Sequence, residues 1–224
     1  MPDNQINGVD FVLPFRFSKG TWSLGTRGPV TLRIGEVENL VTARNITADL
    51  QGDYPWTEDN PLLLTNVKVE TLGGKITMQQ LRMPQHDPAL LRVDNISSSE
   101  LIGAVNPKQF AMSGPVSGAL PFWLDNEKWI IKDGWLTNPG PMTLRIDKDT
   151  ADAIVKDNMV AGAAINWLRY MEISRSWTRI NLDNLGELTM QATIKGTSRV
   201  DGKSSSVNLN YTHDENVFTL WRSL

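Results

Sequence analysis

Few residues in this sequence have the type and spacing for acid–base or nucleophilic chemistry. The two histidines, His86 and His213, each precede an aspartate in a turn-like stretch, and we interpret them as solvated loop residues. The run Gly114-Pro115-Val116-Ser117-Gly118 does not have the Gly-x-Ser-x-Gly spacing of a nucleophile elbow. Its proline and glycines favour a bend in a strand, so these residues predict no hydrolytic site.

Phosphate and metal motifs are also incomplete. Gly73-Gly74-Lys75 lacks the rest of a phosphate loop and leads into a strand pattern instead of a helix. Asp147, Asp149 and Asp152 lack the spacing and the glycine of a calcium loop, and they fit the start of a helix that Asp149 could cap. We therefore expect no catalytic residue, no metal, no cofactor and no enzyme activity.

The composition is that of a folded domain. The 224 residues are 40% hydrophobic and 21% charged, enough to bury a sizeable core, and we interpret residues 1–224 as a single domain. The net charge is −3 and the basic residues are scattered singly, which predicts no nucleic-acid partner. The chain has no cysteine, which excludes disulfides and thiolate chemistry.

Tryptophan is unusually frequent, with eight residues. Tryptophan prefers places where one end of the side chain is apolar and the other is wet. Packing in the core and at its rim explains such residues, and stacking on sugar rings or lining a groove for amphiphiles are the functional alternatives. They are Trp22, Trp56, Trp123, Trp129, Trp135, Trp167, Trp177 and Trp221.

Apolar and polar residues alternate with a period of two along most of the chain, which predicts strands with one apolar face. The alternating runs include Val30–Ile34, Val67–Glu70, Ile76–Gln79, Leu91–Asp94, Leu144–Asp147, Ile180–Asp183, Leu188–Lys195, Val207–Tyr211 and Phe218–Leu220. Turn signals between them are Gly73-Gly74, Asp133-Gly134, Asn138-Pro139-Gly140-Pro141 and Asp201-Gly202.

Two segments are predicted as helices. Ser97 to Glu100 form a capping-box pattern before a short helix that ends near Pro107. A longer amphipathic helix is expected from Thr150 to Met171. Its apolar stripe, spaced by four, consists of Ala151, Val155, Met159, Ala163, Trp167 and Met171. This helix would lie over the apolar sheet face as a plug, a gate or a simple cover of the core.

A sheet with one apolar face must cover that face with a second sheet, with a helix, or by curling on itself. A curved sheet that folds only partly over leaves an apolar trough, which suits acyl chains because each buried CH₂ contributes about 0.8 kcal/mol. The residues expected to line such a trough are Val67, Val69, Ile76, Met78, Leu144, Ile146, Leu188, Met190, Ile194, Val207 and Leu209. A closed sandwich would show the same alternation.

Several short motifs follow one another in an order that resembles the C-terminal region of AsmA-like bacterial envelope proteins. The resemblance covers most of the chain, and the stretch 113–183 carries most of it. The motifs are Gly73–Ile76, Leu91–Ile96, Ser113–Pro121, Ile131–Leu136, Pro139–Met142 and Trp167–Ser176.

This resemblance implies a mainly β fold, an extended and curved antiparallel sheet forming a groove (β-taco-like), with one long amphipathic helix and one short helix. It implies a periplasmic conduit that carries phospholipid between the inner and outer membranes. The full-length protein would be anchored in the inner membrane through regions outside this chain, which we expect to be a C-terminal fragment.

The resemblance also implies a partner. One branch of the family is associated with a small outer-membrane lipoprotein, YnbE, and such a partner could add a strand to the sheet edge. The apolar end of the chain, with Phe218, Leu220 and Trp221, is the expected partner edge. Two alternatives stay open: a structural module that docks the lipoprotein and handles no lipid, and a carbohydrate-binding β-sandwich.

Overall fold

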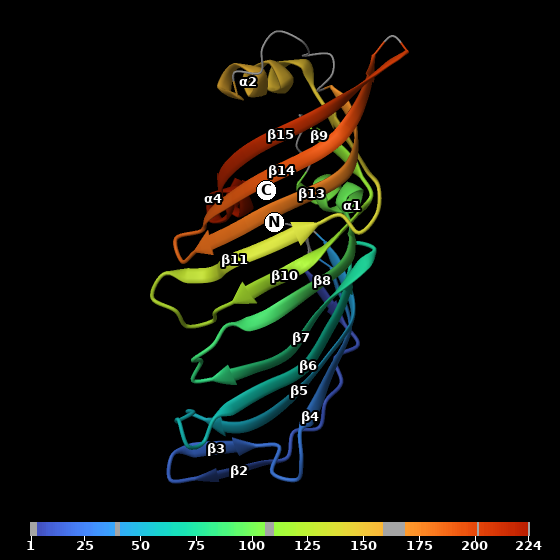
Figure 1. Ribbon diagram of the computed structural model, residues 1–224. Helices are drawn as coiled ribbons and strands as arrows, with labels where there is room; N and C mark the ends of the chain where they lie inside the picture. Colours follow the sequence, from blue (N-terminus) through green and yellow to red (C-terminus); the bar gives the residue numbers. More distant parts are fainter. Residues whose placement is uncertain (1–3, 39–40, 106–109, 159–168, 201, 224) are drawn as a thin grey trace.

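The computed structural model describes residues 4–38, 41–105, 110–158, 169–200 and 202–223. One antiparallel sheet of 15 strands dominates these ranges, which confirms the predicted mainly β class (Figure 1). The strands are β1 (Gln5–Asn7), β2 (Phe15–Ser18), β3 (Thr21–Leu24), β4 (Val30–Glu38), β5 (Thr42–Tyr54), β6 (Leu62–Thr71), β7 (Gly74–Met83), β8 (Ala89–Ser97), β9 (Phe110–Ser113), β10 (Pro115–Phe122), β11 (Trp129–Thr137), β12 (Met142–Ile146), β13 (Tyr170–Asp183), β14 (Glu187–Val200) and β15 (Lys203–Asn216).

The sheet is an open meander. From β4 to β8, and again from β13 to β15, each strand pairs with the next strand in the sequence. The short strands β1, β2 and β3 extend one end of the sheet, and β15 forms the other end, where β14 is its one partner among the described strands. The two ends lie far apart in Figure 1, and the sheet does not close into a barrel.

A bent hairpin forms the middle of the sheet. β9 continues into β10 across Gly114, whose φ of +104° is a left-handed value that favours glycine. β11 continues into β12 across residues 138–141, and the two bent strands pair throughout, β10 with β11 and β9 with β12. The long strand β13 then pairs with both β11 and β12, so one continuous ladder crosses the bend.

Left-handed residues interrupt the regular alternation inside the strands. Asn45, Asn66, Asn95 and Asp133 have φ values between +49° and +56° and lie within β5, β6, β8 and β11. Each marks the position where the ladder carries an extra residue, which makes a β-bulge that bends the strand. The predicted turn at Asp133-Gly134 is therefore wrong, because these residues lie in the interior of β11.

The bulged amides are hydrogen-bonded by side chains of the opposite strand. Two residues, Asp94 and Asn95, oppose Ser117, and the Asn95 amide donates to Ser117 Oγ at 2.9 Å. Likewise the Asp133 amide donates to Asn181 Oδ1 at 2.8 Å. Because an unpaired amide within a sheet is costly, these side chains stabilise the bulges.

Apolar side chains gather on one face of the sheet, which we call the inner face. One buried cluster joins β12, β13 and β15 through Leu144, Met171 and Leu209, with Ala151 of a helix packed against them. A second cluster joins β7 and β8 through Met78, Leu81 and further residues, with Trp56 and Phe122 at its margin. The opposite, outer face carries mostly charged, hydroxyl and amide side chains.

Short helices lie at the margins of the sheet. Helix α1 (Ser98–Val105) begins at the predicted capping box, where the Glu100 amide donates to Ser97 Oγ at 3.3 Å. Helix α2 (Lys148–Asn158) lies beyond β15 in Figure 1. Helix α4 (Val217–Ser223) is capped by Asn216, whose Oδ1 accepts the Thr219 amide at 2.9 Å. No helix within the described ranges is long and apolar enough to cross a membrane.

Two predicted boundaries are wrong. Met171, expected at the end of the long helix, lies in β13, where it pairs with Leu144 and is fully buried. Phe218 and Leu220, expected in a final strand, lie in helix α4. Thr150 to Asn158 of the predicted long helix are helical as expected, and residues 159–168 lie outside the described ranges.

Close packing of adjacent backbones predicts opposite effects for two glycine substitutions. An added Cβ at Gly118 in β10 would lie 1.9 Å from the Trp135 carbonyl oxygen, whereas at Gly103 in α1 it would meet nothing within 4 Å. We expect Gly118→Ala to lower the free energy of unfolding by about 1–3 kcal/mol. Gly103→Ala should raise it by about 0.5–1 kcal/mol, since alanine favours a helix. Urea denaturation measures both, and an equal effect of the two changes would contradict this packing.

Candidate functional site

The register brings the predicted lining residues to the inner face. Val67 pairs with Met78 and Val69 pairs with Ile76. From Ile76, a row of partners continues across the sheet to β15, and it lies on the same face throughout. The row consists of Ile76, Val93, Gly118, Leu136, Thr178, Ala192 and Tyr211. Leu188, Met190, Ile194, Val207 and Leu209 alternate in phase with this row on β14 and β15.

The inner face is closed at one end and partly open elsewhere. Leu144, Ile146 and Leu209 retain 5%, 2% and 4% of their exposure in the cluster that includes Ala151 of α2. Val67, Val69, Ile76, Leu188, Met190, Ile194 and Val207 are only half-buried, and Met78 is buried. The face therefore consists of a covered core beneath α2 and of apolar side chains with access to solvent.

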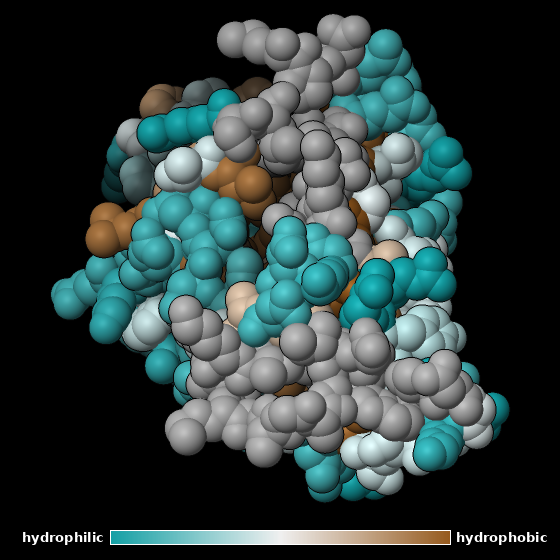
Figure 2. All heavy atoms as spheres, turned by 90° about the horizontal axis from the view of Figure 1, so that it is seen from above, coloured by the Kyte–Doolittle hydropathy of each residue, from teal (hydrophilic) through white to brown (hydrophobic). Residues whose placement is uncertain are grey.

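Seen from above, hydrophobic side chains are visible in separate patches, in the middle of the view and at its left edge, among mostly hydrophilic ones (Figure 2). The registers place most apolar side chains on the inner face, which also carries Thr178 and, opposite Leu188 and Met190, Glu215 and His213. An apolar surface that keeps some solvent access can exclude water by binding an apolar ligand. The interaction that this face offers is hence the non-directional burial of apolar surface.

Sequence reasoning missed several residues of this face. Val93, Ile96, Met142 and Ile180 are buried on it although they were not predicted as lining. Val93 and Ile180 lie in alternating runs that the sequence shows, but they were not included in the predicted lining. Ile96 follows the bulge at Asn95, which shifts the alternation by one position. The asparagines themselves are the available signal, since asparagine tolerates the left-handed region better than most residues.

Of the predicted long helix, the structure describes the first part as helical, in α2. Ala151 is completely buried against β12 and β13, while Val155 lies within α2 and its side chain is not described. Met159, Ala163 and Trp167 lie outside the described residues. Met171 contributes to the same cluster from β13, as a strand residue and not as a helix residue.

The outer face carries a ladder of alternating charges that suits solvent. Glu36, Arg44, Glu70, Lys75 and Asp94 are successive cross-strand partners from β4 to β8. Arg44 Nε lies 2.9 Å from Glu36 Oε2. Opposite charges on directly paired positions stabilise a sheet, so this row fixes the register on the outer side.

The two histidines have different settings. His86 is exposed in a loop as predicted, and its Nε2 lies 2.6 Å from Glu58 Oε1, a contact that lowers the pKa of the Glu58 carboxyl. His213 was expected in a turn, but it lies in β15, where Tyr211 Oη is 3.2 Å from its Nδ1 and Glu215 is 3.3 Å from its Nε2. Neither joins a metal-binding group among the described residues.

The free edge of the sheet is β15, not the chain end. All fourteen residues of β15, Lys203 to Asn216, pair with β14 on one side, and no described strand pairs with the other side. Phe218 folds back over the turn between β13 and β14, where a Cβ on Gly186 would lie 2.5 Å from its ring. Phe218, Leu220 and Trp221 thus belong to a helix, and the prediction that they form a strand edge is wrong.

An open antiparallel sheet with one extended apolar face defines a class of β proteins whose surface suits apolar ligands. The chain belongs to the YdbH-like family, because the family model described as "Intermembrane phospholipid transport protein YdbH" matches residues 1–224. This is a family of transport proteins and not of enzymes. The AsmA-like resemblance inferred from the motif order is confirmed at this level.

A curated relative supports the same assignment. The chain is 80% identical over all 224 residues to the "Probable phospholipid transport protein YdbH" of Escherichia coli (strain K12). It spans 26% of the length of that relative. No solved structure matches the chain.

The start of α2 allows a test of how this helix is held over the inner face. The structure corrects the predicted cap, because the Thr150 amide donates to Asp147 Oδ1 at 2.8 Å. Hydrogen bonds from the Thr150 side chain and amide lower the pKa of Asp147 below its ordinary value of 3.8. The ionised Asp147 carboxylate therefore stabilises the start of α2 above pH 3.8. This stabilisation is lost as the pH falls through the lower pKa that Asp147 has in the folded protein.

We expect Asp147→Ala to speed amide hydrogen exchange in the first turn of α2 at neutral pH, because it removes the cap. Asp149→Ala is the matched control, since Asp149 is also in the first turn but does not accept this bond. An NMR titration of the Asp147 carboxyl should give a midpoint below 3.8. Equal exchange in both variants would show that Asp147 does not hold the helix.

Proposed function

We propose that this chain is a periplasmic lipid-conduit module that binds phospholipid acyl chains along its inner face. In this proposal, phospholipid passes between the inner and outer membranes, and the inner face forms part of the path. The observation that carries the proposal is the row of cross-strand partners from Ile76 to Tyr211, mostly without polar side chains and interrupted by Thr178, on one face of an open sheet. The names of the family and of the relative support phospholipid as the ligand.

Physical chemistry favours acyl chains on such a face. Each methylene removed from water contributes about 0.8 kcal/mol, and the interaction has no preferred direction, so a chain can slide without losing a specific contact. Half-buried residues such as Met190, Ile194 and Val207 have surface left to cover. The lining in this proposal consists of Val67, Val69, Ile76, Met78, Leu144, Ile146, Leu188, Met190, Ile194, Val207 and Leu209.

Helix α2 closes the inner face at one end. Ala151 is buried among Leu144, Ile146 and Leu209, so three of the proposed lining residues are already covered by protein. We propose that lipid occupies the remaining part of the face and that α2 covers the core at this end. The full-length protein would supply the inner-membrane anchor and the rest of the path.

A partner strand is the second part of the proposal. The long edge of β15 exposes backbone donors and acceptors that a further strand can pair with. A strand with alternating apolar and polar residues would continue the inner face beside Leu209 and the outer face beside Asn210. A small outer-membrane lipoprotein of the YnbE type suits this role, with β15 instead of the chain end as its docking edge.

Charge on the inner face should abolish lipid binding. We expect wild-type protein isolated from bacterial envelopes to carry phospholipid in native mass spectrometry, and Met190→Glu to carry about tenfold less. Position 190 lies between Ile180 and His213, and a carboxylate there resists burial beneath an acyl chain. Gln191→Glu is the matched control, since its neighbouring side chain is exposed on the outer face. Leu188→Gln provides a milder change on the inner face.

The outcomes separate the alternatives. A clean lipid-free mass for folded wild-type protein would contradict the conduit and favour a module that only docks a partner. Unfolding of both Met190→Glu and Leu188→Gln would show that this face is an ordinary core. Circular dichroism of each variant distinguishes loss of lipid from loss of structure.

Strand addition at β15 can be tested by disulfide cross-linking, since the chain has no cysteine of its own. We expect Asn210→Cys on β15 to cross-link to a cysteine-substituted strand of the lipoprotein in envelopes. Thr137→Cys is the control, because β11 is paired on both sides and offers no edge. Cross-linking at both positions, or at neither, would contradict docking at this edge.

A further inference from the structure

Two tryptophans stack on the outer face of the sheet, opposite the proposed lipid path. Trp135 of β11 and Trp177 of β13 have ring centroids 4.8 Å apart and planes inclined by only 8°. Trp177 keeps 49% of its surface exposed. Trp177 is thus a large aromatic side chain that remains half exposed among polar neighbours on the outer face of the sheet.

Cross-strand pairs define the surroundings of this stack, which we call the tryptophan face. Three rows of outer-face partners run through it from β10 or β13 to β15. They are Ser117, Thr137, Trp177, Thr193 and Asn210; Ala119, Trp135, Arg179, Gln191 and Thr212; and Arg175, Lys195 and Asn208. These positions comprise hydroxyl and amide side chains, three cations, one alanine and the two tryptophans.

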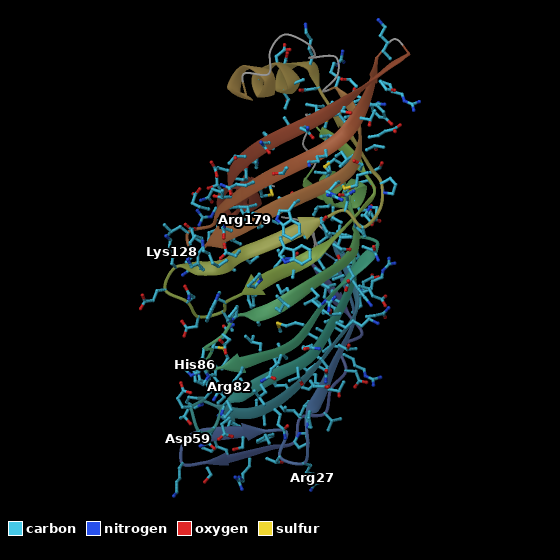
Figure 3. The ribbon with its side chains drawn as sticks, viewed as in Figure 1. Arg27, Asp59, Arg82, His86, Lys128 and Arg179 are labelled. Carbon is cyan, nitrogen blue, oxygen red and sulfur yellow. The ribbon has the colours of Figure 1, made fainter. Side chains whose placement is uncertain are left out.

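The charge of the tryptophan face is opposite to that of the chain. The protein has a net charge of −3, yet none of these positions is acidic. Arg175, Arg179 and Lys195 are exposed, and none of them forms an ion pair with another described residue. Arg179 is labelled in Figure 3. Towards β4, the row of Ala119 and Trp135 continues through Arg92, Lys68 and Arg33, again without an acid, whereas the ladder from Glu36 to Asp94 alternates in charge. The rows on either side of the tryptophan face carry the acids Glu172 and Asp214.

We propose that the tryptophan face binds the glycan strands of the cell wall, an anionic polymer of sugar rings with attached carboxylates. The exposed part of the Trp135–Trp177 stack offers an aromatic surface for the apolar face of a sugar ring. The threonine, asparagine and glutamine side chains offer hydrogen bonds to sugar hydroxyl and amide groups. The three cations complement the carboxylates of the polymer.

The shape and composition of the face favour a glycan over a bilayer. A surface that inserts into a membrane gathers several apolar side chains, whereas this face surrounds two tryptophans with hydroxyl and amide groups. The paired rows extend across several strands, which gives a long surface for a linear polymer. The face also points away from the inner face, so it can bind a glycan without interfering with lipid.

Co-sedimentation with purified peptidoglycan sacculi tests the proposal. We expect Trp177→Ala to weaken binding about tenfold, and Arg175→Gln with Arg179→Gln to weaken it similarly and to reduce its dependence on salt. Arg33→Gln is the matched control, because it removes an outer-face cation on β4, far from the tryptophans in the strand order. Trp177→Phe keeps an aromatic ring and should retain most of the binding.

The same variants distinguish this proposal from the lipid path. Trp177→Ala should still carry phospholipid in native mass spectrometry, whereas Met190→Glu should still bind sacculi. Binding of Trp177→Ala equal to that of the wild type would overturn the proposal. So would a loss in Arg33→Gln as large as in the arginine pair, or binding to lipopolysaccharide or anionic phosphatidylglycerol vesicles in place of sacculi.

Discussion

Every strand must keep its apolar side chains in phase with those of its neighbours while the sheet bends, and the rest of this structure depends on that condition. A one-residue slip would move a whole strand's apolar set to the other face. Left-handed residues such as Asn95 and Asp133 let the strands meet this condition. At each of them the strand contains one residue more than its partner, so the strand bends and its apolar side chains return to the inner face at the same position. Ser117 and Asn181 hydrogen-bond the amides that the bulges free.

The apolar side chains stay on one face from strand to strand, and the arrangement of the two ends of the sheet decides whether the sheet itself encloses that face. Because the meander never returns to its first strand, the apolar face is not enclosed by the sheet itself, and other elements must cover it. Helix α2 covers one part through Ala151, and the half-buried remainder is available to a ligand. The same openness leaves β15 with a free edge. The proposed ligand on the face and the proposed strand at the edge would both satisfy this one structural condition.

The alternation in the sequence was sufficient to predict most strands and the face on which the lining residues lie, because a period of two assigns sides without any tertiary information. It failed at Met171, because the spacing of four from Trp167 fits a helix and the alternation with Ile173 fits a strand equally well. In the structure Met171 pairs with Leu144 and therefore lies in a strand. It also failed at Phe218, where three alternating residues were too few and the cap at Asn216 produced a helix. The bulges were not predicted, because a bulge is defined by how a strand pairs with its neighbour, and the alternation within one strand does not show this pairing.

The two faces of each strand can be changed separately, since neighbouring side chains such as Ser176 and Trp177 point to opposite sides. Ser176 is buried on the inner face, where Asn138 accepts its amide hydrogen bond, and Trp177 stands exposed on the outer face. A sheet one layer thick therefore presents two surfaces from a single set of backbone hydrogen bonds. Burial governs the composition of the inner surface and contact with water that of the outer one, which explains why the cations lie on the outer face.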